Sequence, residues 1–207
     1  MANELNDIRV AILATDGFEQ VELTEPLKAL RQAGARVEVV SPKAGGIQGY
    51  HHHEKGDTLP VDRTLEQTEA RDYDALVLPG GVINPDALRL IPSAISFIRH
   101  FVDARKPIAA ICHGPWTLIN AGGVKGRLMT SWPSLEIDLR NAGADWVDET
   151  VVVDRGLVTS RKPQDLDDFC AVMIEEFSKA RHHHEAEGHA GSEQEGESAA
   201  NAQGANI

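Results

Sequence analysis

The chain has 207 residues, of which 42% are hydrophobic and 25% are charged, which is ordinary for a globular protein of one domain or of one domain with an appendage. No apolar run approaches the roughly 18–20 residues of a transmembrane helix, and the N-terminal residues carry acids where a signal peptide carries basic residues, so we expect a cytoplasmic protein outside any membrane. The formal net charge of −12 argues against nucleic-acid backbones as the main partner, because such binding needs a basic patch.

Two periodicities alternate along the first 180 residues. Short apolar runs typical of buried strands are separated by segments of helical period, and a hairpin follows near the end. This alternation predicts an α/β fold, namely a three-layer sandwich of the flavodoxin-like or Rossmann-like type with a mostly parallel sheet and one β-hairpin. In chain order, we expect strand 8–14, helix 22–33, strands 36–41 and 74–79, helix 91–105, strand 107–111, a helix from 114, helix 133–142, strands 151–154 and 157–160, and a helix from 163.

The composition changes sharply after residue 180. Residues 181–207 contain no aromatic residue and almost no large aliphatic one, but they include five glutamates. Such a segment buries too little apolar area to offset its ordering entropy. We therefore expect a single domain over residues 1–180 and a disordered, acidic, histidine-containing tail over residues 181–207.

Cys112 stands between a predicted strand and a predicted helix, in the sequence Ala110-Ile111-Cys112-His113-Gly114-Pro115. The small residues two before and two after it are typical of a nucleophile elbow, with cysteine in place of the usual serine. The N-terminal end of the helix would favour the thiolate. We therefore interpret Cys112 as a reactive thiol of lowered pKa, whereas a buried structural cysteine is the alternative. Cys170 stands on an apolar helix face, and we interpret it as structural.

Small and acidic residues follow other predicted strands, at the edge where sheets of this type place their sites. Gly80 and Gly81 would let backbone N–H groups form an oxyanion hole, and a simple tight turn is the alternative. Glu19 and Glu22 stand at a helix start, where carboxylates favour the helix dipole and where one of them can also point into the site. The expected oxyanion-hole and substrate-binding residues are Gly80, Gly81, Glu19, Gly114 and Trp116.

Five segments stand in order between about Ile8 and Phe177: ATDGFEQVELTEP, DALVLPGG, KPIAAICHGPWTLINAGGVKGR, TSWPSLEIDLRNAGADWVDETVVVD and LVTSRKPQDL. Together they resemble the DJ-1/PfpI superfamily, and within it the PfpI (protease I-like) branch. The resemblance implies a flavodoxin-like sandwich similar to that of class I glutamine amidotransferases. It also implies a homodimer or a larger homo-oligomer.

The resemblance implies roles for four catalytic residues. Cys112 corresponds to the nucleophile, Glu22 to a buried glutamate that hydrogen-bonds the thiol, and His113 to the histidine that follows the cysteine. Asp86 stands within one residue of the position where the PfpI branch commonly has an acid from a neighbouring subunit. We expect the ring of His113 to point to the surface, where Asp86 of another chain would orient it, and capping of a short helix is the alternative role of Asp86.

Several other chemistries are not expected. Neither G-x-G-x-x-G nor G-x-x-x-x-G-K-[ST] follows a predicted strand, so no nucleotide cofactor is expected. The stretch 159–164 lacks the His-x-Glu unit of class I glutamine amidotransferases, so glutaminase activity is not expected. The histidine triplets 51–53 and 182–184 lack a fixed geometry, so we expect neither a metal nor another cofactor.

Three hypotheses about function remain open. The first is a stress-response enzyme of the glyoxalase or deglycase type, in which Cys112 attacks a small reactive carbonyl or the carbonyl of a glycated amine. Glu22 or His113 would move the protons, and backbone N–H groups would hold the oxyanion. The second hypothesis is a cysteine peptidase or amidase. The third is an oxidative-stress sensor or chaperone whose Cys112 is oxidised without turnover.

Overall fold

The computed structural model describes residues 4–179, and a seven-stranded sheet ordered β11-β12-β8-β7-β1-β3-β6 forms its centre. Every neighbouring pair is parallel except β11 and β12, which form the antiparallel hairpin expected near the end of the domain. The predicted fold class is therefore confirmed, whereas the tail predicted for residues 181–207 lies outside the described residues. The strands are β1 (Arg9–Leu13), β3 (Arg36–Ser41), β6 (Arg63–Thr64), β7 (Ala75–Leu78), β8 (Ile108–Ile111), β11 (Val151–Asp154) and β12 (Leu157–Ser160).

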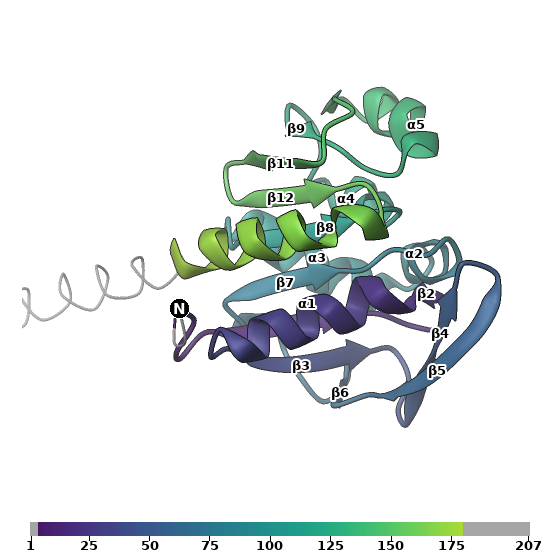
Figure 1. Ribbon diagram of the computed structural model, residues 1–207, viewed down its shortest axis with the longest axis vertical. Coiled ribbons are helices and arrows are strands. Elements are labelled where there is room, and N and C mark those ends of the chain that lie inside the picture. The colour runs from purple at the N-terminus through teal and green to yellow at the C-terminus, as the bar shows by residue number, and fades with distance from the viewer. Residues whose placement is uncertain (1–3, 180–207) are drawn as a thin grey trace, which may run out of the picture.

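Helices cover both faces of this sheet, which gives the three layers seen in Figure 1. Because successive strand side chains point to opposite faces, Ile12 belongs to one hydrophobic cluster and Leu13 to the other. The first cluster is closed by α1 (Gln20–Gln32) and by a last helix over residues 166–179. The second is closed by α2 (Ile83–Arg89), α3 (Pro92–Asp103), α4 (Pro115–Ala121) and α5 (Glu136–Asn141). Among residues 4–179, no helix has the length and apolar character needed to cross a membrane.

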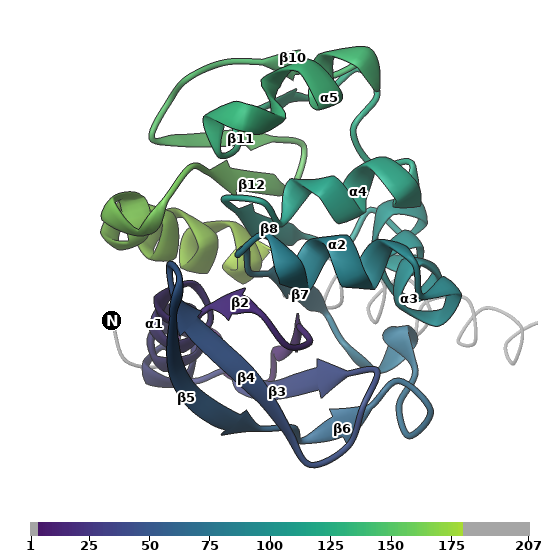
Figure 2. The same ribbon diagram turned by 90° about the vertical axis from the view of Figure 1, so that its right-hand side faces the viewer.

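A second, three-stranded sheet was not predicted from the sequence. It contains β2 (Phe18–Glu19), β4 (Gly46–His51) and β5 (Glu54–Pro60), and Figure 2 shows it beside α1. No residue of β5 is buried, so this strand lacks the alternation of apolar and polar residues that identifies strands in a sequence. A short parallel pair, β9 (Leu128–Met129) with β10 (Asp145–Trp146), was missed because each strand has two residues.

The predicted helix boundaries differ at proline-containing starts. The helix expected over residues 133–142 begins as a 3-10 turn, Pro133–Leu135, and continues as α5. The helix expected from residue 163 likewise begins with the 3-10 turn Pro163–Asp165. Such turns are frequent at the start of an α-helix, where the first N–H groups have no intrahelical partner.

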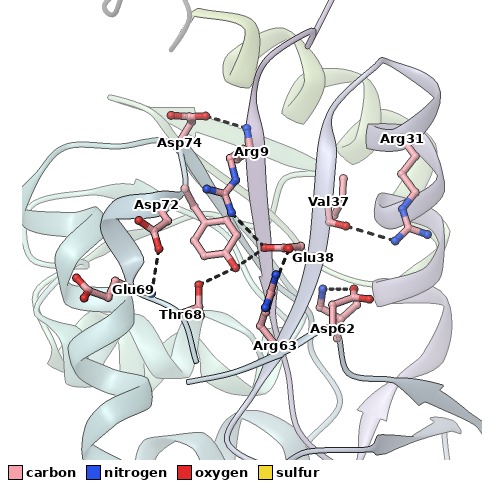
Figure 3. Close-up of polar contacts among 12 residues, drawn as sticks. Arg9, Arg31, Val37, Glu38, Asp62, Arg63, Thr68, Glu69, Asp72 and Asp74 are labelled. Carbon is pink, nitrogen blue, oxygen red and sulfur yellow. Dashed lines mark hydrogen bonds and ion pairs between the residues drawn. The ribbon is translucent and has the colours of Figure 1, made fainter. Parts of the chain in front are cut away.

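A polar cluster ties β3 to its neighbouring strands β1 and β6 and to the segment before β7. Glu38 of β3 lies between Arg9 and Arg63, each 3.5 Å away (Figure 3). The hydroxyl of buried Tyr73 donates to Glu38 Oε2 at 2.6 Å, and Thr68 Oγ1 lies 3.0 Å from the same hydroxyl. The tyrosine hydroxyl and the two guanidinium groups hold the pKa of Glu38 below its ordinary value although burial opposes them. Burial and the Glu38 carboxylate raise the pKa of Tyr73 to about 12.

We expect Tyr73→Phe to lower the free energy of unfolding by about 1–3 kcal/mol at pH 7, because the change removes a hydrogen bond to a charged group. Since the pKa of Glu38 is lowered in the folded state, its contribution is present above the unfolded pKa and is lost on acidification. Since the pKa of Tyr73 is raised, its contribution is full below pH 10 and is lost as the pH rises through about 12. Urea unfolding of both proteins at several pH values measures this difference, and equal stabilities at pH 7 would contradict it.

Candidate active site

A pocket of about 380 Å³ opens at the carboxyl ends of the central strands. Cys112 and His113 enter it directly after β8, and Gly81 and Val82 enter it after β7. Glu19 and Glu22 reach it from the start of α1. Segments that are distant in the sequence thus meet at the sheet edge where α/β folds bind their ligands.

Cys112 occupies a sharp turn between β8 and α4. Its φ of 60° lies in the left-handed region, which costs a residue with a side chain about 1–3 kcal/mol. The backbone of this turn is fixed because the Cys112 N–H donates to Ser160 O and its carbonyl accepts from the Trp132 N–H. A Cβ at Gly114 would collide with the carbonyl oxygens of Leu78 and Ile111, so this position requires glycine. The strand, turn and helix have the arrangement expected of a nucleophile elbow.

The carboxyl group of Glu22 lies beside Cys112, because both border the space left by the missing side chain of Gly80. Glu22 is fully buried, and its Oε2 accepts the Gly80 N–H at 3.0 Å. Oε1 is buried without a hydrogen-bond partner in the part of the chain that the structure describes, which leaves it available to hold a proton. Burial, assisted by the neighbouring Glu19 charge, raises the pKa of Glu22 to about 8. The carboxyl group is therefore protonated at neutral pH.

The thiol of Cys112 differs from the sequence-based expectation of a lowered pKa. Cys112 is only 7% exposed, and burial together with the Glu22 carboxylate raises the pKa of its thiol. The N–H groups of Gly81 and His113 lower the thiol pKa but do not outweigh these effects. The N-terminal end of a helix favours a thiolate only where the sulfur remains solvated or lies next to a cation. Here the sulfur is buried and lies next to the carboxyl group of Glu22, which disfavours the thiolate. If this sulfur acts as a nucleophile, a base has to take the proton of the thiol.

His113 provides a base at the required distance. Its Nδ1 lies 3.2 Å from Cys112 Sγ, and its ring lies between the indoles of Trp116 and Trp132, with centroids 5.4 Å and 6.1 Å away. The expectation that this ring points to the surface is wrong, because His113 is 7% exposed. Burial lowers the pKa of His113 to about 4, so the ring is neutral at pH 7 and has a free lone pair, but it is a weaker base than an ordinary histidine.

The two glycines after β7 have different tasks. The Gly80 N–H is engaged by Glu22, so this group is not free to stabilise an oxyanion. A Cβ at Gly80 would lie 2.5 Å from Glu22 Oε2 and 2.6 Å from Cys112 Cβ, so glycine provides the space in which the two acids meet. Gly81, at a φ of 75°, lines the pocket together with Cys112, and its backbone N–H lowers the pKa of the thiol. The N–H groups of Gly81 and His113 are therefore the oxyanion-hole candidates.

Asn84 holds this glycine loop in place, a role that was not predicted from the sequence. It is fully buried, its Oδ1 accepts the Thr15 N–H at 2.8 Å, and its amide donates to the carbonyls of Pro79 and Gly80 at 3.0 and 3.2 Å. The sequence offered one signal for this role, namely an asparagine four residues after Gly80. Only Asn and Gln side chains carry an amide that can both donate to a backbone carbonyl and accept from a backbone N–H.

We expect Asn84→Ala to lower the free energy of unfolding by about 2–4 kcal/mol, because it leaves three buried backbone groups without partners. Turnover should fall as well, since Gly81 is then no longer fixed over the thiol. Asn141→Ala, at the exposed end of α5, is the matched control. Urea unfolding measures the effect, and a loss no larger than that of the control would show that Asn84 does not hold the loop.

The remaining predicted residues are not all brought to the pocket. Asp86 is exposed on α2 and does not line the pocket within this chain. Trp116 packs against the ring of His113 and donates its indole N–H to Asp138 at 2.7 Å, so it supports the pocket without lining it. Trp132 lines the pocket but was not predicted, because it follows no strand of the central sheet.

Comparisons with known proteins identify the family of this chain. A sequence model of the DJ-1/PfpI family matches residues 8–176. A deglycase of Pyrococcus abyssi is 46% identical over 159 residues, covering 77% of this chain and 93% of that protein. A Bacillus subtilis protein named "Putative cysteine protease YraA" is 41% identical over 162 residues, covering 78% and 93%. The crystal structure of Drosophila melanogaster DJ-1beta covers 86% of this chain and 91% of its own, with a TM-score of 0.75 and 29% identity.

Proposed function

This chain belongs to the DJ-1/PfpI family, and on that basis we propose that it is a cysteine-dependent enzyme acting on small reactive carbonyls or on their adducts with amines. The observation that carries the proposal is the thiol of Cys112 in a pocket, with the protonated Glu22 carboxyl and the neutral His113 ring beside it. This set supplies a nucleophile, an acid and a base. The deglycase name of the Pyrococcus abyssi relative favours carbonyl chemistry for such a set.

The geometry supports a first step in which protons balance. Cys112 Sγ bonds to the carbonyl carbon while its proton passes to His113 Nδ1, 3.2 Å away. The carbonyl π pair moves to the oxygen, which the N–H groups of Gly81 and His113 stabilise and which then takes the proton of Glu22. The proton held by His113 replaces the one that Glu22 gives up, so the product is a neutral hemithioacetal.

The dimensions of the site favour a small substrate over a peptide. A pocket of about 380 Å³ lies at the lower end of the range typical of small-molecule sites, roughly 300–1,000 Å³. The lining residues enclose the thiol between the glycine loop, Trp132 and the turn that contains His52 and His53. A peptidase would need an extended groove on both sides of the nucleophile.

The products of the wild-type protein test the proposal. We expect methylglyoxal to be converted to lactate, and adducts of methylglyoxal with an amine to release the amine faster than without enzyme. Cys112→Ser should do neither. Cleavage of a peptide without conversion of either carbonyl would favour the peptidase, and stoichiometric oxidation of Cys112 without any turnover would favour the sensor.

We further infer that the chain forms a homo-oligomer in which Asp86 of one subunit approaches the site of another. Asp86 is exposed on α2 next to Val82 and Ile83, which are 54% and 58% exposed. Exposed apolar side chains around a pocket are typical of an interface between chains. Mixing inactive Cys112→Ser chains with Asp86→Ala chains should restore activity in hetero-oligomers. Full activity of Asp86→Ala alone would exclude a catalytic role for this acid.

A further inference from the structure

The turn between β4 and β5 forms one wall of the pocket mouth. His52 and His53 line the same pocket as Cys112, although the turn belongs to the second sheet. In Figure 2 the tip of this hairpin extends toward the start of the last helix, which is the side where Pro163 also lines the pocket. No function was predicted for this histidine triplet from the sequence.

Glu19 holds His52 by two contacts with the same oxygen. The backbone N–H of His52 donates to Glu19 Oε2 at 3.0 Å, and the Nδ1 atom of its ring lies 3.8 Å from that oxygen. The Glu19 side chain is 11% exposed, whereas the His52 side chain is 74% exposed. The pair therefore joins an acid inside the pocket to an imidazole that solvent can reach.

The backbone of His52 has a conformation that residues with side chains rarely adopt. Its φ is 57°, in the left-handed region. Five described residues other than glycine have such a φ, and only two of them, His52 and Cys112, line the pocket. Strained conformations persist where the surrounding structure holds them, and they concentrate at functional sites. The two-residue turn between paired His51 and Glu54 accounts for this φ, and the Glu19 contact fixes the turn at the mouth of the pocket.

The reaction proposed above needs a proton donor at the solvent side of the pocket when the substrate is an amine adduct. His113 and Glu22 already act at the thiol, and Asp86 lies outside the pocket of its own chain. Among the described lining residues, His52 is the imidazole that has a carboxylate within 4 Å.

We propose that His52, oriented by Glu19, is the catalytic acid that protonates the departing amine of a carbonyl–amine adduct. When the C–N bond breaks, its electron pair goes to the nitrogen, which takes the proton of the His52 imidazolium. The hydroxyl group on the same carbon loses its proton to a water molecule, from which His52 regains a proton. The products are a free amine and an aldehyde group on the carbon next to the carbonyl carbon that Cys112 has already attacked, so release of the amine needs Cys112 as well as His52. This role rests on the proposed function and defines its substrate as an adduct with an amine leaving group.

Two substrates of the full chain test the role of His52. We expect His52→Gln to slow the enzyme-catalysed release of the amine from a methylglyoxal–N-acetyllysine adduct by about 10- to 100-fold. Conversion of free methylglyoxal, which has no amine to protonate, should change less than about twofold. His51→Gln is the matched control, because His51 belongs to the same hairpin but does not line the pocket. Added imidazole should partly restore amine release to His52→Ala.

The outcomes separate this inference from the proposed function. Equal losses on both substrates in His52→Gln would show a structural role, and behaviour like that of His51→Gln would show no role. If wild type converts free methylglyoxal but does not release the amine, the proposed function stands and the role of His52 is wrong. If wild type matches Cys112→Ser on both substrates, the proposed function fails and the role of His52 fails with it.

Discussion

Cys112→Ser should abolish turnover, with a loss of at least about 1,000-fold in kcat, because a hydroxyl at this position is a far weaker nucleophile than a thiol. The effect should be the largest of any single substitution, since the attacking sulfur contacts the reacting carbon directly. The pocket should survive, because serine is slightly smaller than cysteine and the turn is held by backbone bonds to Ser160 and Trp132. Steady-state assays with methylglyoxal measure the loss, and circular dichroism measures the fold.

Cys170→Ser is the matched control for this experiment. Cys170 belongs to the last helix and is partly buried against the first hydrophobic cluster. Burial raises the pKa of its thiol to about 12, so it is unreactive at neutral pH. Activity should remain within about twofold of wild type. Turnover that survives in Cys112→Ser but disappears in Cys170→Ser would show that Cys112 is not the nucleophile.

Glu22→Gln should lower kcat by about 100-fold or more and should change the pH profile. The pKa of Glu22 is raised to about 8, so the carboxyl group carries its proton at pH 7 and loses it as the pH rises through about 8. If it gives that proton to the substrate oxygen, wild-type kcat/KM should decline above pH 8. Glutamine can donate a hydrogen bond but cannot give up a proton. The decline in kcat/KM above pH 8 should therefore be absent from the residual activity of Glu22→Gln.

Glu25→Gln is the control on the same helix. Glu25 lies three residues later, where its side chain is 49% exposed and 3.8 Å from Lys28. Its substitution should leave both kcat and the pH profile unchanged. If kcat/KM of Glu22→Gln still declines above pH 8, a group other than Glu22 causes the decline. Full activity of Glu22→Gln would show that Glu22 takes no part in the mechanism.

The features that depend on neighbours along the chain could be predicted from the sequence by itself. Buried parallel strands are continuous apolar runs, so strands such as 74–79 and 107–111 were identified within a residue or two. The elbow around Cys112 was identified because its steric requirement falls on Gly114, two residues away. The site was placed at the carboxyl edge of the sheet because strand and helix alternation fixes that topology.

Only the tertiary structure decided what surrounds the thiol. Glu22 and Gly80 meet Cys112 through packing of α1 and the β7 loop, and the resulting burial decides where the protons lie, which reversed the expected direction of the thiol pKa. The contacts of Asn84 with Thr15 and of Glu19 with His52 are equally invisible in the sequence, because the partners are 69 and 33 residues apart. A sequence pattern reports the period of burial along one element, whereas proton affinity depends on how completely several elements exclude water from one point.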